Sequence, residues 1–430
     1  MRPHHPTGRM PRMPRMPRAA LVAALAASAV ALAACNSLLD VDNPGRVPSE
    51  ALDDAALIPP LEAGALQQFQ CGFGQWVSTA GMLAGEYISA NGFVDNHIWE
   101  WRGVPEIRNN PGTCATTRGQ TFMGFYTPLQ QARYQLDDLA KRAAAFTDAQ
   151  VANRPRILAE AAAYGGYAYL LLAEGMCELA FDNGPRVTRA EALRTAAQRF
   201  TEAIALAATA NDASLRNMAT VGRARARLDL GDLPGAAADA ALVPSGFVRP
   251  AEYSESQVPR ENRLYNLTVR NDFLSVGPDY RGLTLPNGQA DPRVRVTNTG
   301  RVGSDNVTPV WQQQKFTGSG AVAPPIASYA EAQLILAEAS GGQAAVEAIN
   351  RVRALSNVPA LAGPPPADVT ALVLEERRRQ LFSEGQRYAD MLRKNLPFPT
   401  GANRKGQTYS GLTCVPLPDV ETRNNPNLGA

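Results

Sequence analysis

Histidine is scarce in this sequence, which limits the catalytic centres that the chain could hold. Only three histidines occur in 430 residues, and two of them, His4 and His5, lie at the extreme N-terminus. A Ser-His-Asp or Cys-His site in the rest of the chain would therefore depend on His97 alone. The H-E-x-x-H, G-x-S-x-G and P-loop motifs are also absent. These absences predict a protein that is not an enzyme and that has no resident metal or cofactor.

Long apolar runs are equally scarce. The alanine-rich run Ala19–Ala31 is too short for a comfortable transmembrane helix, and no later run is long enough. A basic segment precedes it, and Leu32-Ala33-Ala34-Cys35 follows with the aliphatic-small-small-Cys pattern of a lipobox. We expect residues 1–34 to be a lipoprotein signal peptide and Cys35 to be acylated as the first mature residue. The alternative is an ordinary secretory cleavage that falls near a cysteine.

Lipid on Cys35 would anchor the protein, because each buried methylene contributes about 0.8 kcal/mol. Asn36 follows it, where an aspartate would be the usual signal for retention in the inner membrane, so we expect the outer membrane. Cleavage removes five of 42 basic residues and no acidic one, which leaves 37 against 40 and a net charge near −3. No basic field that could bind nucleic acid remains.

Four cysteines remain after Cys35 is assigned to the lipid. Outside the cytoplasm an even number favours disulfides, and four cysteines allow three pairings. We favour Cys71–Cys114, which would close a glycine-rich loop region, and Cys177–Cys414, which would tie the C-terminal tail to the helical body. Zinc is the competing interpretation, and it is weak because the sequence has no C-x-x-C spacing.

Helical periodicity dominates two parts of the chain. Residues 121–243 are alanine-rich, and glycine and alanine flank the Gly231-Asp232 turn with the rhythm of a tetratricopeptide helix pair. The sequence therefore predicts a mainly α fold, a tetratricopeptide-like superhelix of about four helix pairs with long loops and small β elements. The predicted helices are Pro128–Phe146, Arg156–Ala180, Glu191–Ala210, Ser214–Val243, Tyr329–Ser340, Ala344–Leu355 and Glu375–Arg393.

The remaining segments are irregular. Helix-compatible residues Leu61–Gln70 and Trp76–Tyr87 give way to a loop, and a second irregular segment covers 244–325. Short β-like runs appear at Leu264–Val269, Val294–Val296 and Val307–Gln312. We expect a single domain over 35–430, divided into a loop-rich part (36–127), helical repeats (128–243), an irregular insertion (244–325) and C-terminal helices with a tail (326–430).

Aromatic residues make up only 7% of the chain, yet three of its four tryptophans lie between 61 and 127 among polar residues. An aromatic ring can pack on the C–H face of a sugar while carboxylates and amides hydrogen-bond its hydroxyls. For each ring the competing interpretation is burial in the core. In a strand, Trp99 and Trp101 would face the same side. The candidate ligand-binding residues are Trp76, Tyr87, Asp95, Asn96, Trp99, Trp101, Tyr280 and Trp311.

A cluster of charges marks the last predicted helix. Spacing allows Glu376 to meet Gln380, and Asp390 to meet Arg387 and Arg393. Such charges at helical spacing most often form a network that fixes helix packing, so we expect a structural signature rather than a catalytic one. Its members are Glu376, Arg377, Glu384, Gly385, Arg387, Asp390 and Arg393.

These motifs together resemble the SusD/RagB family of outer-membrane lipoproteins. The order AEA, INRVR, then ER, LF, EG, R, D and LR is similar to its C-terminal signature, although Gln380 stands where the family often has Glu. Three further segments agree, LLDVDNP (Leu38–Pro44), DPRVRV (Asp291–Val296) and CVPLPDVETRNNPNL (Cys414–Leu428). The resemblance implies a helical superhelix and a surface-exposed lipoprotein that binds a glycan or another oligomeric nutrient. It also implies a partner, a SusC-like TonB-dependent outer-membrane β-barrel.

Two other functions compete with nutrient binding. One is a glycoside hydrolase that uses a pair of carboxylates drawn from Glu86, Asp95, Glu100 and Glu106. The other is a scaffold that holds peptides on tetratricopeptide helices.

Overall fold

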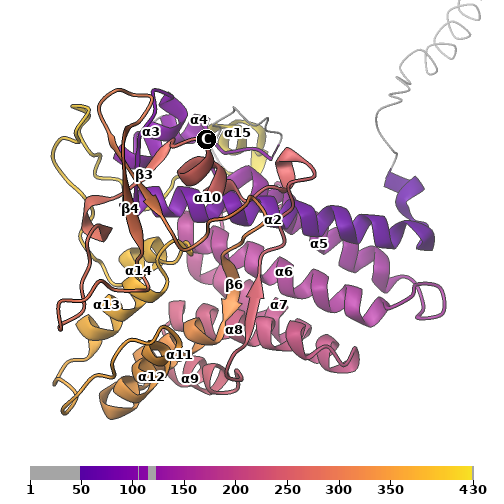
Figure 1. Ribbon diagram of the computed structural model, residues 1–430. Coiled ribbons are helices and arrows are strands. Elements are labelled where there is room, and N and C mark those ends of the chain that lie inside the picture. Colours follow the sequence, from indigo (N-terminus) through magenta and orange to yellow (C-terminus); the bar gives the residue numbers. More distant parts are fainter. Residues whose placement is uncertain (1–48, 105, 115–122, 429–430) are drawn as a thin grey trace, which may run out of the picture. The chain divides into compact units, whose positions relative to one another are not determined.

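Stacked helices build most of the protein (Figure 1). The computed structural model describes residues 49–104, 106–114 and 123–428. The chain divides into the units Met1–Asp54 and Ala55–Ala430. The described part of the first unit holds the 3₁₀ helix η1 (Ser49–Leu52), and the predicted signal peptide and Cys35 lie outside the described residues. The fold described below is that of the second unit.

Six helices of the second unit pack on one another in chain order (Figure 1). Side-chain caps start several of them. Thr188 forms a capping box with Glu191, while Asp212 and Asp232 accept hydrogen bonds from the first-turn N–H groups of Leu215 and Gly235. The helices are α2 (Ile58–Leu83), α5 (Tyr126–Ala144), α6 (Arg154–Gly175), α7 (Arg189–Thr209), α8 (Ala213–Asp229) and α9 (Leu233–Ala241).

The predicted mainly α fold with long loops and small strands is confirmed. The ends of α5 and α7 agree with prediction to within a few residues, whereas α6 ends at Gly175, five residues before its predicted end. The stretch predicted over Ser214–Val243 is the helix pair α8 and α9, divided at the predicted Gly231-Asp232 turn. The two helices predicted for the N-terminal part are one, because α2 continues through Cys71–Gln75 without a break. The boundaries predicted for the domain and its parts stay predictions.

Phe200 of α7 fills the space between α6 and α8, and two glycines make room for its ring. A Cβ atom at Gly166 would lie 2.8 Å from the ring, and one at Gly222 would lie 2.4 Å from it. Real side chains do not approach this closely, so the helices can pack at this distance only with glycine at both positions. The small-residue faces visible in the sequence thus serve helix packing.

Gly222→Ala is expected to destabilise the protein by about 1–3 kcal/mol, because its methyl group must displace the buried ring of Phe200. Gly64→Ala is the matched control. Gly64 lies inside α2 with no atom within 4 Å of its would-be Cβ, so alanine there should stabilise by roughly 0.5–1 kcal/mol. Urea unfolding of both variants measures the difference, and equal effects would contradict this account of the packing.

The C-terminal helices follow the sequence prediction with one correction. The helix predicted over Glu375–Arg393 is two helices, because Ser383 and Gly385 adopt left-handed backbone conformations with φ of 67° and 75°. A Cβ at Gly385 would lie 2.9 Å from the indole nitrogen of Trp76, so glycine lets this turn pack on α2. The helices are α11 (Tyr329–Ser340), α12 (Gly342–Leu355), α13 (Thr370–Gln380), α14 (Arg387–Arg393) and α15 (Asp419–Asn424).

Three two-stranded antiparallel sheets occur among the described residues. They pair β1 (Tyr87–Ser89) with β3 (Leu274–Val276), β2 (Val248–Pro250) with β6 (Pro325–Ser328), and β4 (Val296–Val302) with β5 (Pro309–Gln313). The predicted run Val307–Gln312 largely coincides with β5, whereas Val294–Val296 only reaches the start of β4.

The strand predicted over Leu264–Val269 is wrong. This segment is helical because the Asn262 side chain accepts the N–H groups of Leu264 and Tyr265 and so starts a helical turn. The short helices here are α10 (Arg263–Tyr265) and the π-helical η4 (Asn266–Arg270). The other short helices are η2 (Ala55–Leu57), α3 (Val94–Trp101), α4 (Glu106–Asn109), η3 (Val258–Arg260), η5 (Pro278–Tyr280) and η6 (Pro426–Leu428).

Both favoured disulfides, Cys71–Cys114 and Cys177–Cys414, are confirmed. The second joins residues 237 positions apart and ties the C-terminal tail to the end of α6. Two backbone hydrogen bonds support it, from the Cys177 N–H to the Val415 carbonyl and from the Val415 N–H to the Gly175 carbonyl.

Most of the signature charges lie in buried ion-pair networks. Arg377 binds Asp390 at 2.8 Å, and Arg393 binds both Asp390 and Glu338. Glu376 binds Arg293 and Arg353 from other segments rather than Gln380, and Glu384 binds Lys315. Arg387 does not pair with Asp390 as the spacing suggested, because Asp390 already faces Arg377 and Arg393. In the described ranges, none of the helices has the length and apolar character of a membrane span.

Candidate functional site

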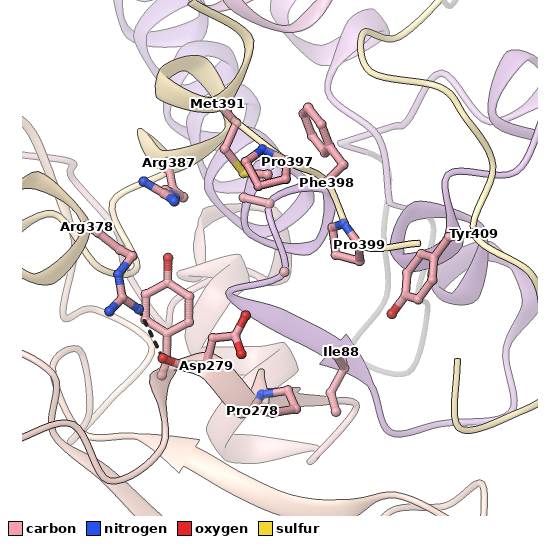
Figure 2. A pocket seen from close by; sticks show the side chains of 13 residues that line it. Ile88, Pro278, Asp279, Arg378, Arg387, Met391, Pro397, Phe398, Pro399 and Tyr409 are labelled. Carbon is pink, nitrogen blue, oxygen red and sulfur yellow. Dashed lines mark hydrogen bonds between the residues drawn. The ribbon is translucent and has the colours of Figure 1, made fainter. Parts of the chain in front are cut away.

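A cleft of about 730 Å³ lies between four segments of the second unit (Figure 2). They are the end of α2 with β1, the short helix η5, the helices α13 and α14, and the segment 397–409. Its volume falls in the range of small-molecule sites. The residues that line it are Ala84, Gly85, Ile88, Pro278, Asp279, Tyr280, Arg378, Arg387, Met391, Pro397, Phe398, Pro399 and Tyr409.

Two half-buried aromatic rings, Phe398 and Tyr409, form part of the cleft wall. Arg102 holds them in place, because its guanidinium lies 5.2 Å from the Phe398 ring centre and 5.3 Å from that of Tyr409. Arg102 also donates hydrogen bonds to the carbonyls of Pro399 and Leu412, at 2.7 and 2.9 Å. The irregular segment that carries the rings is therefore anchored at both ends.

Charged groups lie on other walls of the cleft. Arg378 binds the Glu375 carboxylate at 2.7 and 2.8 Å, donates to the Asp279 carbonyl at 3.0 Å and covers the Tyr280 ring at 5.1 Å. Figure 2 draws the contact between Arg378 and Asp279 as a dashed line. Arg387 is half-buried and makes no hydrogen bond or ion pair with any residue that the structure describes. The cleft thus offers aromatic surface, a carboxylate and guanidinium donors.

A buried carboxyl lies close to the cleft. Glu86 is 1% exposed, and its Oε1 accepts the Ser383 N–H at 3.3 Å while Oε2 has no hydrogen-bond partner. Burial raises the pKa of Glu86 to about 7. The Tyr280 hydroxyl, on a side chain that is 2% exposed, also lacks a hydrogen-bond partner.

Glu86→Gln is expected to reduce the loss of stability that the protein suffers at alkaline pH. The folded-state pKa of Glu86 lies above its ordinary value of 4.5, so its stabilising contribution is fully present below pH 4.5 and is lost as the pH rises through about 7. Between pH 5 and pH 8.5 the unmutated protein should lose roughly 1–3 kcal/mol more than the glutamine variant. Urea unfolding at the two pH values measures this, with exposed Glu347→Gln as the control. Equal pH dependence of Glu86→Gln and the unmutated protein would contradict it.

The structure buries five of the eight predicted ligand-binding residues. Trp76, Tyr87, Asn96, Trp99 and Tyr280 are each 0–2% exposed. Trp76 and Trp99 pack against the Phe125 ring, and Tyr87 and Tyr280 stack on the Phe382 ring. The prediction that the faces of these rings bind a ligand is corrected, because the core already covers them.

The other three predicted residues, Asp95, Trp101 and Trp311, are half-buried and do not line the cleft. Trp311 lies under the Arg281 guanidinium at 5.2 Å. Trp99 and Trp101 belong to the helix α3 rather than a strand, so they do not share one face. Of the eight, Tyr280 alone lines the cleft, and it does so with a buried side chain.

Sequence reasoning missed the rings that do line the cleft, Phe398 and Tyr409. They lie in a proline- and glycine-rich segment, where no periodicity indicates which side chains are exposed. The only signal was their own composition, Pro397-Phe398-Pro399 and a tyrosine among polar residues.

None of the four carboxylates considered for catalysis lines the cleft, and two of them, Glu86 and Glu100, are buried. Glu86 is buried, Glu100 pairs with Arg404 at 2.5 Å, and neither lines the cleft. His97 contacts the Asn91 carbonyl and lies 2.8 Å from the Lys405 ammonium nitrogen, while Lys405 also binds Asp305. Within residues 49–104, 106–114 and 123–428 no group of three or more His, Cys, Asp or Glu side chains is arranged to hold a metal ion.

Comparisons with known proteins place this architecture among known folds. Residues 248–426 match a family model described as the SusD family. A SusD superfamily protein from Bacteroides fragilis has a similar structure, with 16% identity, coverage of 88% of this chain and 99% of that one, and a TM-score of 0.63. A SusD-like carbohydrate binding protein from Bacteroides vulgatus has 15% identity, coverage of 87% and 97%, and a TM-score of 0.62. A laminarin binding SusD-like protein has 14% identity, coverage of 86% and 98%, and a TM-score of 0.59. At the level of sequence, no curated protein matches this chain.

Proposed function

Because this chain belongs to the SusD/RagB-like family, we propose that it is a non-enzymatic, lipid-anchored protein of the outer membrane that captures a glycan at the cell surface. It would cap a SusC-like TonB-dependent β-barrel and deliver the glycan to it for import. The observation that carries this proposal is the family match over residues 248–426, which includes every cleft residue except Ala84, Gly85 and Ile88.

The chemistry of the cleft supports a sugar ligand. The Phe398 and Tyr409 rings provide apolar surface for the C–H faces of pyranose rings, and the Asp279 carboxylate and two arginines can hydrogen-bond hydroxyls. Two of the similar structures are a SusD-like carbohydrate binding protein and a laminarin binding SusD-like protein. Each such contact contributes about 1 kcal/mol net, so affinity should be modest, which suits release into a transporter.

A glycan array tests the binding proposal. The probe protein is the Cys35→Ser chain, which can be exported but not acylated. We expect it to retain at least one class of oligosaccharide, and we expect Tyr409→Ala to weaken that binding about tenfold through loss of ring contact. Tyr134→Ala is the control, because Tyr134 is 57% exposed and does not line the cleft. Retention of no glycan would refute the proposal, and the appearance of shorter products would favour a hydrolase.

Labelled palmitate and copurification test the anchor and the partner. Label should enter the unmutated chain and be absent from Cys35→Ser. Affinity purification from detergent-solubilised outer membranes should recover a large β-barrel together with the protein. Migration of the protein with the cytosol would count against both the anchor and the transport role.

A further inference from the structure

Arg387 differs from the other arginines that lack a partner. Four arginine side chains form neither a hydrogen bond nor an ion pair with any described residue. They are Arg194, Arg216, Arg260 and Arg387. Three of them are exposed at the surface, where water solvates the guanidinium. Arg387 is half-buried and lines the cleft (Figure 2). A partly desolvated guanidinium without an anion is unfavourable, so its position calls for a partner that the described chain does not supply.

The nearby carboxylates do not serve as that partner. Asp390, three residues along the same helix, is held by Arg377 and Arg393 at 2.8 Å each. Glu384 is held by Lys315 at 2.7 Å. Glu86 is buried and forms no ion pair or hydrogen bond with Arg387, although the arginine charge acts on it through space and lowers its pKa against the effect of burial. Asp279 comes from η5 and forms no ion pair among the described residues.

The cleft therefore holds one guanidinium without a direct hydrogen-bond or ion-pair partner among the described residues, at a place that a ligand can reach. A guanidinium offers its donors in a planar fork that matches the two oxygens of a carboxylate or sulfate group. The Phe398 and Tyr409 rings lie in the same cleft and suit the carbon skeleton of a sugar.

We propose that Arg387 binds the anionic substituent of an acidic sugar, either a carboxylate or a sulfate ester. This inference rests on the proposed glycan-binding function and narrows its ligand class. The free Asp279 carboxylate in the same cleft favours a singly charged substituent over a doubly charged one, and it can accept hydrogen bonds from hydroxyls of the same sugar. The sugar ring then spans from the arginine to the aromatic wall.

Thermal shift and calorimetry on the full Cys35→Ser chain test the proposal. Monosaccharide probes are used so that the result does not depend on the glycosidic linkage of an oligosaccharide. The charged probes are glucuronate, galacturonate and glucose 6-sulfate, and the uncharged ones are the methyl esters of both uronic acids and glucose. We expect at least one charged probe to bind and its uncharged counterpart to bind about tenfold more weakly or not at all. The identity of the bound probe distinguishes a carboxylate from a sulfate.

Variants locate the effect. Arg387→Gln should abolish the preference for the charged probe, Arg387→Lys should restore part of it, and Arg194→Gln, at an exposed unpaired arginine, should leave it unchanged. If Arg387→Gln fails to fold, the binding of acid and ester to the protein that keeps Arg387 still shows whether the site prefers an anion. The inference would be overturned if the acid and its ester bound equally well. It would also be overturned if all glycans retained on the array were neutral and bound Arg387→Gln as well as the unmutated protein. Either result would leave the proposed glycan-binding function intact. An array without any ligand would overturn both.

Discussion

Replacing Arg225 by methionine is expected to lower the free energy of unfolding by about 3–5 kcal/mol. Arg225 is 5% exposed in α8, and its guanidinium binds both oxygens of Glu174 at 2.6 Å and Glu331 at 3.4 Å. Both carboxylates are 1% exposed, and burial already raises the pKa of Glu331 to about 7 with Arg225 present. Without the arginine each carboxylate must either keep an unpaired buried charge or take up a proton, and both cost free energy. Urea unfolding at pH 7 measures the loss.

Two comparisons show whether the loss comes from unpaired charge. Adding Glu174→Gln and Glu331→Gln to Arg225→Met should recover part of the stability, since the two side chains that faced the arginine are then neutral. Arg186→Met removes a surface pair with Glu178, whose side chains are 47% and 39% exposed, and should cost less than about 1 kcal/mol. A loss below 1 kcal/mol for Arg225→Met, or no recovery in the triple variant, would contradict the expectation.

Replacing Cys177 and Cys414 together by serine is expected to cost about 4–5 kcal/mol. The disulfide joins residues 237 positions apart, and a crosslink that closes a long loop removes more conformational entropy from the unfolded chain than one that closes a short loop. The double substitution leaves no free thiol that could pair elsewhere. Urea unfolding of the oxidised proteins measures the effect.

The same disulfide holds the C-terminal tail, so its loss should also be visible locally. Trypsin should cleave after Arg423, whose side chain is 74% exposed, faster in the double variant than in the unmutated protein. The shorter loop between Cys71 and Cys114, 43 positions apart, should contribute less when removed in the same way. A smaller loss for the 237-residue loop than for the 43-residue loop would contradict the entropic explanation.

Much of the helical framework could be predicted, because helix formation depends on local spacing. The predicted helix Tyr329–Ser340 agrees with α11 at both ends, and the Gly231-Asp232 turn separates α8 from α9 as expected. The errors in secondary structure occur where two local preferences in the sequence compete. Leu264–Val269 has the β-branched and apolar residues of a strand, but the cap at Asn262 starts a helical turn in the folded protein.

The candidate site was predicted poorly, and the reason is physical. Tryptophan and tyrosine suit both a core and a sugar-binding surface, since each combines a large apolar ring with one polar group. Trp76 and Trp99 became core because Phe125 and the helices around it cover them. Phe398 and Tyr409 became cleft walls because Arg102, some 300 residues earlier in the chain, anchors their segment.

By itself the sequence determined the helical class and the resemblance to the SusD/RagB family, and it predicted the lipid anchor, since all of these depend on spacing and composition along the chain. It favoured one of three cysteine pairings, and the tertiary structure decided that one. Only the tertiary structure decided which rings are exposed, which arginine lacks a counterion and where the cleft lies. These properties depend on neighbours that are distant in sequence. Arg387 illustrates the difference, because its spacing from Asp390 suggested an ion pair, whereas in the folded protein Arg377 and Arg393 already occupy that carboxylate.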